Sequence, residues 1–312
     1  MHTPKGLHRD KILEWLGTLA KILEQAEKVD TMLKVIDTHQ HLWDTSNLSY
    51  PWLDDFDALD KRYLIEDYRR ACEGINVVRS VHVEADVAPT HVVDEVKWLA
   101  QIVHSDGMVG AIVAAAPLED SNVEQILKQL VEYEHVVSIR RMAWHRPDNE
   151  FYRSPGLIKG VQLLEEFDLS FDLCANHQQL PAAIDLVKAT PNVRHAVNHC
   201  GGPDIKGKQF QPWADYMSEL ASFDNVNCKV SGIVTTASET WTKAELKPYI
   251  DHLVAAFSYD RLMFGSDWPV CTLAAEYQQW VEALLWAVQD ATDMDRQKLF
   301  HDNAKQFYKI GN

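Results

Sequence analysis

Eight short apolar runs, separated by segments of helical character, are the feature that most constrains the fold of this chain. The runs are rich in valine, isoleucine and other strand-forming residues, and no internal repeat links them. They lie at residues 35–37, 77–84, 108–116, 136–143, 169–175, 193–199, 226–232 and 261–267. The segments of helical character lie near residues 65–73, 90–104, 121–134, 155–167, 180–189, 213–222, 243–257, 274–290 and 293–308.

Near-continuous apolar strands that alternate with helices are typical of parallel strands buried on both faces. Eight such units predict an α/β fold of the TIM (β/α)8 barrel type, with the last helix as a C-terminal addition. An open, doubly wound sheet is the alternative. No G-x-G-x-x-G motif follows the first run, which disfavours the nucleotide-binding form of that alternative.

Residues 1–34 differ from the rest of the chain. Apolar residues recur there near helical spacing, and Lys and Glu occupy the other positions, so the segment predicts an amphipathic N-terminal helix ahead of a catalytic barrel at 35–312. Glu14, Glu24 and Glu27 argue against a transit peptide. The helix either packs on the barrel or contacts a partner, which leaves a homodimer possible.

Composition excludes several classes of protein. The chain has 312 residues, 46% of them hydrophobic, which is enough for one large core. A net charge of -16 without any basic run disfavours nucleic acid and anionic membranes as partners. No apolar run approaches the length of a membrane span, and the five cysteines form no C-x-x-C pair. These features predict a cytoplasmic protein with reduced thiols.

Polar side chains recur where the predicted strands end, which is where TIM barrels carry their active sites. His39 and His41 follow the first run, and residues i and i+2 of an extended chain point to one side, so both imidazoles can reach one metal ion. Asp267 ends the last run and can ligate a metal or take a proton from water, or can simply cap a helix. His199 precedes two glycines that allow close approach to a ligand, although a hydrogen-bonded core histidine is the alternative.

Other strand-end residues remain open between a functional and a structural role. Glu84 is a metal ligand, a partner for an arginine, or a surface charge. Only one of Arg140 and Arg141 can face the barrel mouth, where it would bind substrate rather than form a structural salt bridge. His177 is a substrate contact or an ordinary loop histidine. Lys229 is interpreted as structural, so one metal ion is expected rather than two.

Three tryptophans lie in loops that follow the first and fourth runs. Trp43, Trp52 and Trp144 can stack on the face of a sugar ring, or can pack the loops themselves.

With these residues in place, the chain resembles the amidohydrolase superfamily over roughly residues 35–308. More narrowly, it is similar to the branch of lactonases that includes L-fuconolactonase, L-rhamnonolactonase and 2-pyrone-4,6-dicarboxylate lactonase. The matching stretches are VIDTHQHLWD, YPWL at 50–53, FDLCANHQQLP, NHCGGP, NCKVSGIVTTA and RLMFGSDWPVC. Residues 1–34 have no counterpart in the short family N-terminus, and HVEAD at the end of the second run departs from the glutamine-containing segment of many members.

The resemblance implies a barrel and a lactone substrate. It also implies functional roles for His39, His41, His199 and Asp267, and substrate contacts from Arg140 and His177. The resulting hypothesis is a hydrolase in which water attacks the carbonyl carbon of a sugar-acid lactone. Asp267 acts as general base, and His199 assists one divalent metal ion, with zinc as the candidate. That ion is held by His39, His41, Asp267 and Glu84.

Four alternatives stay open at this stage. A 2-pyrone-4,6-dicarboxylate-type lactonase would use the arginines for its carboxylates. A metal-dependent decarboxylase of the same superfamily would keep the histidine pair and Asp267. A C–N hydrolase is less well supported by the motifs, and a non-enzymatic binding protein is disfavoured by the polar residues at so many strand ends.

Overall fold

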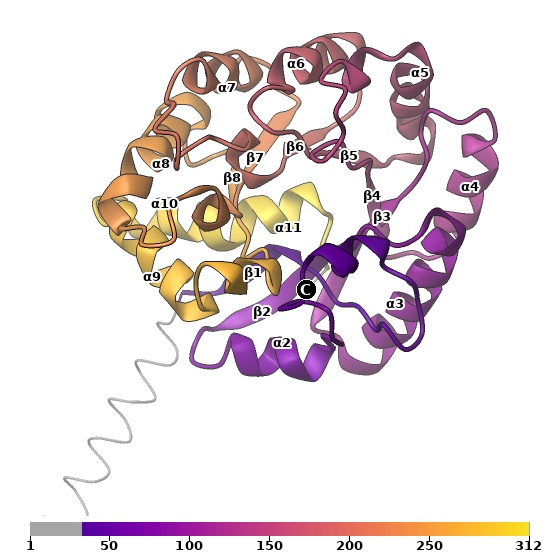
Figure 1. Cartoon of the computed structure of the whole chain (residues 1–312), viewed down its shortest axis with the longest axis horizontal. Helices are drawn as coiled ribbons and strands as arrows, with labels where there is room; N and C mark the ends of the chain where they lie inside the picture. The colour runs from indigo at the N-terminus through magenta and orange to yellow at the C-terminus, as the bar shows by residue number, and fades with distance from the viewer. Residues whose placement is uncertain (1–32, 312) are drawn as a thin grey trace, which may run out of the picture.

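A computed structural model describes residues 33–311 of the chain (Figure 1). Eight parallel strands form one sheet in chain order, each paired with the next. The strands are β1 (Val35–Gln40), β2 (Val77–Val83), β3 (Val109–Ala115), β4 (Val136–Arg140), β5 (Ser170–Leu173), β6 (His195–Val197), β7 (Val226–Val230) and β8 (Leu262–Phe264).

The sheet closes where β8 meets β1. Gln40 and Trp268 form a parallel bridge, the Asp267 amide donates to the His39 carbonyl at 2.7 Å, and the His41 amide donates to the Trp268 carbonyl at 2.7 Å. The predicted TIM barrel is therefore confirmed, and the open-sheet alternative is wrong. All eight predicted strands are present.

Helices surround the barrel and cover the outer face of the strands (Figure 1). They are α2 (Ile65–Ala71), α3 (Val92–Asp106), α4 (Val123–Leu130), α5 (Pro155–Leu163), α6 (Leu180–Ala189), α7 (Trp213–Ala221), α8 (Lys243–Phe257) and α9 (Tyr277–Ala287), followed by α10 (Asp293–Gln297) and α11 (Asn303–Phe307).

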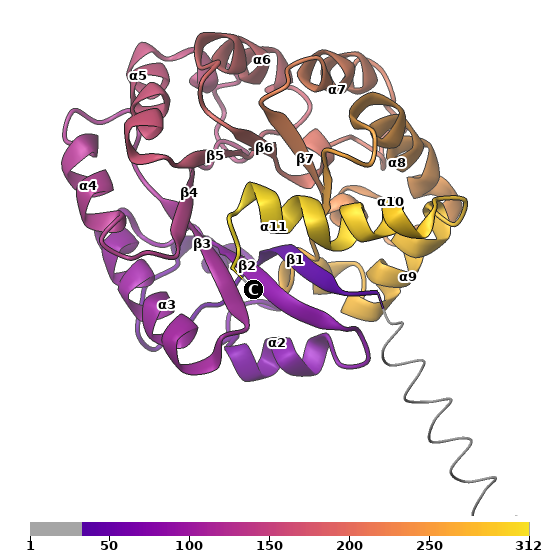
Figure 2. The ribbon, with the colours of Figure 1, turned by 180° about the vertical axis from the view of Figure 1, so that it is seen from behind.

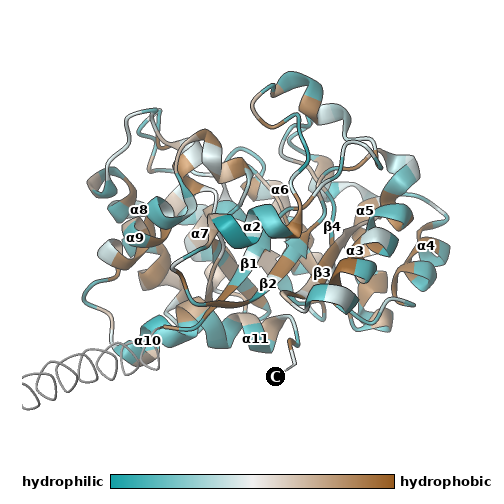
Figure 3. Ribbon diagram, turned by 90° about the horizontal axis from the view of Figure 1, so that it is seen from below, coloured by the Kyte–Doolittle hydropathy of each residue, from teal (hydrophilic) through white to brown (hydrophobic). Residues whose placement is uncertain are grey.

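Local sequence explains where these helices begin and which face they bury. Thr242 and Glu245 form a capping box that begins α8, and Pro155 occupies the first turn of α5, where a missing amide hydrogen does no harm. In α3, Val96 and Leu99 are fully buried against the strands. In Figure 3, β3 is mostly hydrophobic, whereas the helices around it carry both kinds of residue.

The predicted helix at 293–308 is present but is not regular. A π-helical turn at 298–302 separates α10 from α11. α11 crosses the end of the barrel where the strands begin (Figure 2), and Phe307 and Tyr308 pack there against Ile36 and Met263 of the barrel interior. The C-terminal helix thus closes the barrel floor, which leaves the opposite end for a ligand.

The N-terminal helix predicted at 1–34 lies almost wholly outside the described residues, so the helix and the domain boundary at residue 34 stay predictions. From residue 33 to residue 311, no helix is long and apolar enough to cross a membrane.

Candidate active site

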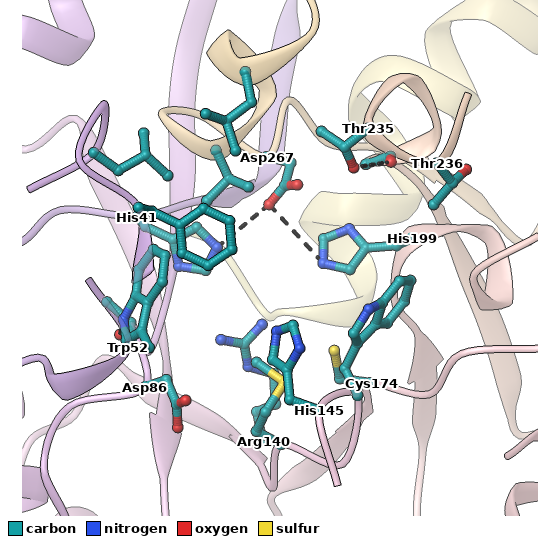
Figure 4. A pocket seen from close by; sticks show the side chains of 18 residues that line it. His41, Trp52, Asp86, Arg140, His145, Cys174, His199, Thr235, Thr236 and Asp267 are labelled. Atoms are coloured by element: carbon teal, nitrogen blue, oxygen red, sulfur yellow. Dashed lines mark hydrogen bonds and ion pairs between the residues drawn. The ribbon is translucent and has the colours of Figure 1, made fainter. Parts of the chain in front are cut away.

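A cavity of about 310 Å³ opens at the carboxyl end of the barrel strands (Figure 4). Its lining includes His41, which directly follows β1, His199, which follows β6, and Asp267, which follows β8. The carboxyl ends of parallel barrel strands meet at one rim, so side chains that are remote in sequence come together there.

Asp267 lies at the centre of three imidazoles. Its Oδ1 is 3.4 Å from Nε2 of His41, 3.7 Å from Nε2 of His39 and 3.9 Å from Nε2 of His199. The four residues that the sequence singled out are thus brought together, and the two histidines of the His39-x-His41 pair do turn toward one point. Asp267 and His199 both have a positive φ, 62° and 51°, a backbone conformation that residues other than glycine adopt at a cost and that is common at functional sites.

The nitrogen atoms of these histidines are placed to bind a cation. Nδ1 of His41 lies 2.7 Å from the carbonyl oxygen of Val83, which can only accept, so in the neutral ring the Nε2 lone pair faces the Asp267 carboxylate. Both ring nitrogens of His39 are buried and have no hydrogen-bond partner among the described residues. Buried polar atoms in native proteins are almost always satisfied.

The residues fit a divalent metal ion. His39, His199 and Asp267 each offer a ligand atom, and these atoms all lie within 4.8 Å of one another. Two imidazoles and a carboxylate are a donor set that suits zinc and related ions. His41 lies beside this group, within reach of the same carboxylate oxygen.

Burial sets the ionisation of the group. It lowers the pKa of His39 well below the usual value, with His199 adding to the effect, and it lowers the pKa of His199 to about 4. Burial alone would raise the pKa of Asp267, but His199 and His41 outweigh it and the pKa falls below its ordinary value. Near neutral pH the imidazoles of His39 and His199 are therefore neutral and can ligate a metal, beside the ionised Asp267 carboxylate.

Asp37 fixes the loop that carries Asp267. Its Oδ1 accepts the amide of Ser266 at 2.8 Å, and its Oδ2 accepts the hydroxyls of Tyr68 at 2.9 Å and Tyr277 at 3.2 Å. This fully buried carboxylate therefore ties β1 to the loop after β8 and to two outer helices, which holds Asp267 in its strained conformation.

Glu84 has a partner other than the metal group. Nε of Arg140 donates to its Oε1 at 2.6 Å, and Nη2 of Arg140 donates to its backbone carbonyl at 2.5 Å. The second carboxylate oxygen accepts the amide of Asp86 at 2.7 Å. In the structure, Glu84 is thus the partner of an arginine, which is the second of the three roles that the sequence left open.

Arg140, the last residue of β4, and Arg141, which follows it, have separate surroundings, as the alternation of side chains along a strand predicts. Arg140 is buried, lines the cavity (Figure 4), and keeps its Nη1 free of hydrogen bonds to the described residues. Arg141 does not line this cavity and instead pairs with Glu119 at 2.6 Å.

Not every predicted substrate contact reaches the cavity. Trp144 lines it, and so does Trp52. Trp43 does not line it, because it is fully buried and its indole nitrogen donates to the Lys61 carbonyl at 2.7 Å, which is the loop-packing alternative. His177 also lies outside the lining, with Nδ1 3.2 Å from the carbonyl oxygen of Gly202.

Five polar residues of the cavity were not among the predicted site residues: Asp86, His145, Cys174, Thr235 and Thr236. The two threonines lie in the short helical turn that follows β7. Asp86 follows β2 and His145 follows Trp144, so both occupy loops that begin at strand ends, a position that could have marked them. Cys174 follows β5, and burial raises the pKa of its thiol to about 12, which excludes it as a thiolate nucleophile near neutral pH.

Comparison with known proteins gives the family. An amidohydrolase family model matches residues 36–310. An uncharacterized protein of Sinorhizobium fredii, y4mH, is 32% identical over 295 residues, which cover 89% of this chain and 99% of that protein. The L-fucono-1,5-lactonase of Burkholderia ambifaria is 28% identical over 280 residues, which cover 88% of this chain and 95% of that enzyme.

Solved structures agree with this result. An amidohydrolase from Burkholderia multivorans with bound zinc is 26% identical, with a TM-score of 0.79 over 89% of this chain and 99% of that chain. This chain belongs to the amidohydrolase family, a family of enzymes whose matched members here include lactonases, which hydrolyse ester bonds.

Proposed function

We propose that this protein is a lactonase that opens the ester ring of a sugar-acid lactone of the L-fucono or L-rhamnono kind. The observation that carries the proposal is the Asp267 carboxylate, ionised and surrounded by three imidazoles, beside a cavity of about 310 Å³. Such a cavity is at the small end of ligand pockets, which range from about 300 to 1,000 Å³, and suits one small ring. The lactonases among the relatives support the same reaction class.

His39, His199 and Asp267 would hold one divalent metal ion, with His41 as a candidate fourth ligand and zinc as the candidate metal. When bound, such an ion supplies Lewis-acid polarisation of the lactone carbonyl.

The protein's own groups account for the movement of the proton. Asp267 takes a proton from the water that attacks the carbonyl carbon. As the ring C–O bond breaks, the same carboxyl group returns this proton to the leaving ring oxygen, which becomes a hydroxyl. The free Nη1 of Arg140 is positioned to donate a hydrogen bond to the substrate, and Ser231, whose Oγ is 3.1 Å from Nδ1 of His199, orients that imidazole.

The arginines near the cavity already have carboxylate partners, which favours a neutral lactone as substrate over the carboxylated substrates of the alternative functions. A pyrone dicarboxylate or the acid substrate of a decarboxylase needs a cation with no internal partner. Among residues 33–311, Arg140 is the only lysine or arginine that lines the cavity. The four arginines that could serve this purpose all have carboxylate partners: Arg140 with Glu84, Arg141 and Arg146 with Glu119, and Arg153 with Asp185.

A panel of lactones, assayed with a pH indicator, tests the proposal. L-Fucono-1,5-lactone and L-rhamnono-lactone should release acid, and the D267N variant should lower kcat by about 100-fold or more, the usual contribution of a general base. Asparagine tolerates the positive φ at this position, so the fold should be kept. The charge-matched control is D290N, because Asp290 is exposed and does not line the cavity.

Two results would contradict the proposal. Release of carbon dioxide from an aromatic or enoic acid, with no turnover of any lactone, would favour the decarboxylase. A D267N variant with turnover near that of the unaltered protein would remove Asp267 from the mechanism.

A further inference from the structure

Asp86 is held in an unusual backbone conformation at the edge of the cavity. It follows β2 and has a φ of 51°, in the left-handed region that residues other than glycine, asparagine and aspartate rarely adopt. Its amide donates to Oε2 of Glu84 at 2.7 Å, and Glu84 is itself fixed by Arg140. The ion pair between Glu84 and Arg140 therefore fixes this conformation, as expected of a residue whose direction matters.

The carboxylate of Asp86 lines the cavity (Figure 4). Unlike those of Glu84 and Glu119, it makes no hydrogen bond or ion pair with another side chain among residues 33–311. It is half-buried, and burial together with the nearby Glu84 charge raises its pKa, although the charges of Arg140 and Arg141 oppose this effect. A desolvated acceptor without a donor is costly unless a ligand supplies the donor.

The Trp52 side chain is hydrogen-bonded to the segment that carries Asp86. The indole nitrogen of Trp52 donates to the carbonyl of Ala85 at 2.7 Å, one residue before Asp86. Trp52 and Asp86 both line the cavity and also line a second cavity of about 270 Å³ beside it. A ring face next to a hydrogen-bond acceptor matches a molecule that has C–H groups on one side and hydroxyls at its edge.

We propose that Asp86 is a specificity-determining residue that accepts hydrogen bonds from the hydroxyl groups of the lactone, while the Trp52 ring packs against the C–H face of the substrate. A carboxylate has two oxygens and can accept from two neighbouring hydroxyls at once. Its charge also repels a lactone that carries a carboxylate of its own. This inference rests on the proposed lactonase function and assigns its substrate class: neutral lactones with free ring or side-chain hydroxyls.

The test compares two lactones on one protein preparation. For the purified full chain, kcat/KM is measured on the hydroxylated sugar lactone and on the unsubstituted ring of the same size, such as δ-valerolactone. If the unsubstituted ring reacts too slowly, its competitive inhibition constant is compared with the KM of the sugar lactone, and neither of these constants depends on the fraction of folded protein. The ratio of the two values is then determined for D86N, D86G and the control D290N. Partial unfolding affects both substrates equally and cancels in the ratio.

Asparagine and glycine are chosen because both accept the positive φ at this position. D86N keeps one acceptor and loses the charge, so the ratio should fall by about 10-fold. D86G loses every acceptor and should lower the ratio by about 100-fold, since hydrogen bonds to a charged group are among the strong ones. D290N should leave the ratio unchanged. A sugar lactone with an added carboxylate should improve relative to the neutral one in D86N.

Failure of this inference is distinct from failure of the proposed function. If the unaltered protein opens no lactone, the proposed function is wrong and the inference falls with it. If the unaltered protein opens sugar lactones but both Asp86 variants keep its ratio, the lactonase function stands and the role of Asp86 is refuted. An unchanged preference against carboxylated lactones in D86N would refute the charge effect.

Discussion

The buried ion pair between Lys229 and Asp172 predicts an asymmetric response to mutation. Both side chains are fully buried inside the barrel, with Nζ 2.5 Å from Oδ2. The carboxylate has three further donors: Ser138 at 2.8 Å, Asn198 at 2.9 Å and Tyr308 at 3.1 Å. Lys229, in contrast, has no other acceptor among the described residues.

Removing the carboxylate should therefore cost more than removing the amine. D172N leaves a buried ammonium without a counter-charge, which typically destabilises a protein by about 3–5 kcal/mol. K229M leaves a carboxylate that still accepts three hydrogen bonds, and methionine fills a similar volume, so a loss of about 2 kcal/mol is expected. The double variant should be more stable than D172N alone, because no unpaired charge remains.

The loss in D172N has an upper limit that depends on pH. Lys229 can give up its proton instead of staying charged, and bringing its pKa from 10.5 to 7 costs about 5 kcal/mol at 1.36 kcal/mol per pH unit. Burial already lowers the pKa of Lys229, despite Asp172. Once the folded pKa lies below the unfolded value, the unfolded state binds more protons, so stability rises with pH. The deficit of D172N should thus shrink by up to about 2.7 kcal/mol between pH 7 and pH 9.

Equilibrium unfolding in urea, extrapolated to water at pH 7 and pH 9, measures these free energies. The reasoning would be refuted by K229M costing as much as D172N at pH 7, or by additive losses in the double variant. The same measurement tests the structural interpretation of Lys229, since a catalytic lysine would lose turnover in K229M well beyond what its stability explains.

Three further predictions concern the metal, a glycine and a histidine. Dialysis against a chelator should lower kcat more than tenfold and reduce the Tm, and zinc should restore both; full activity after verified metal removal would contradict this. G232A should lower kcat more than tenfold, because a Cβ at this position would lie 2.4 Å from Nδ1 of His199. The control G107A, at a glycine with a similar positive φ but open space around it, should lose only stability. Equal kcat values in the two variants would contradict this prediction. Burial lowers the pKa of His195 from 6.5 to about 4, so between pH 7 and pH 4 this histidine is protonated mainly in the unfolded state. Over this range the free energy of unfolding should therefore fall by about 3 kcal/mol less in H195Q than in the unaltered protein. Parallel pH profiles of the two proteins in urea unfolding would refute this prediction.

The order of the strands and the central group of the site could be predicted from the sequence. Apolar runs mark buried strands, and in a parallel barrel all their carboxyl ends meet at one rim, so His39, His199 and Asp267 had to come close once the barrel was inferred. The residues at which the strands end were harder to predict from the sequence. β6 and β8 contain only three residues each, because His199 and Asp267 lie in loops with positive φ, which hydropathy does not reveal.

Side-chain partners beyond the rim could not be predicted. Glu84 and Arg140 are 56 residues apart, and nothing local distinguishes this pair from a metal ligand and a substrate clamp. Trp43 was expected to face a sugar as readily as Trp144, yet its indole is directed to a backbone carbonyl of its own long loop. Such choices depend on the path of a loop in three dimensions, which sequence periodicity does not describe.

The site and the closure of the barrel are one structural unit. The backbone hydrogen bonds that close the sheet between β1 and the end of β8 come from the Asp267 and His41 amides, and the Thr38 hydroxyl adds a bond to the Phe264 carbonyl at 2.7 Å. The backbone of two central residues thus helps to close the sheet. Asp37 braces the same seam through Ser266. Because β8 is only three residues long, this seam has few other backbone hydrogen bonds between strands. Opening of the seam would therefore separate Asp267 from the imidazoles before the rest of the barrel unfolds, and activity should be lost at lower urea concentrations than helical structure.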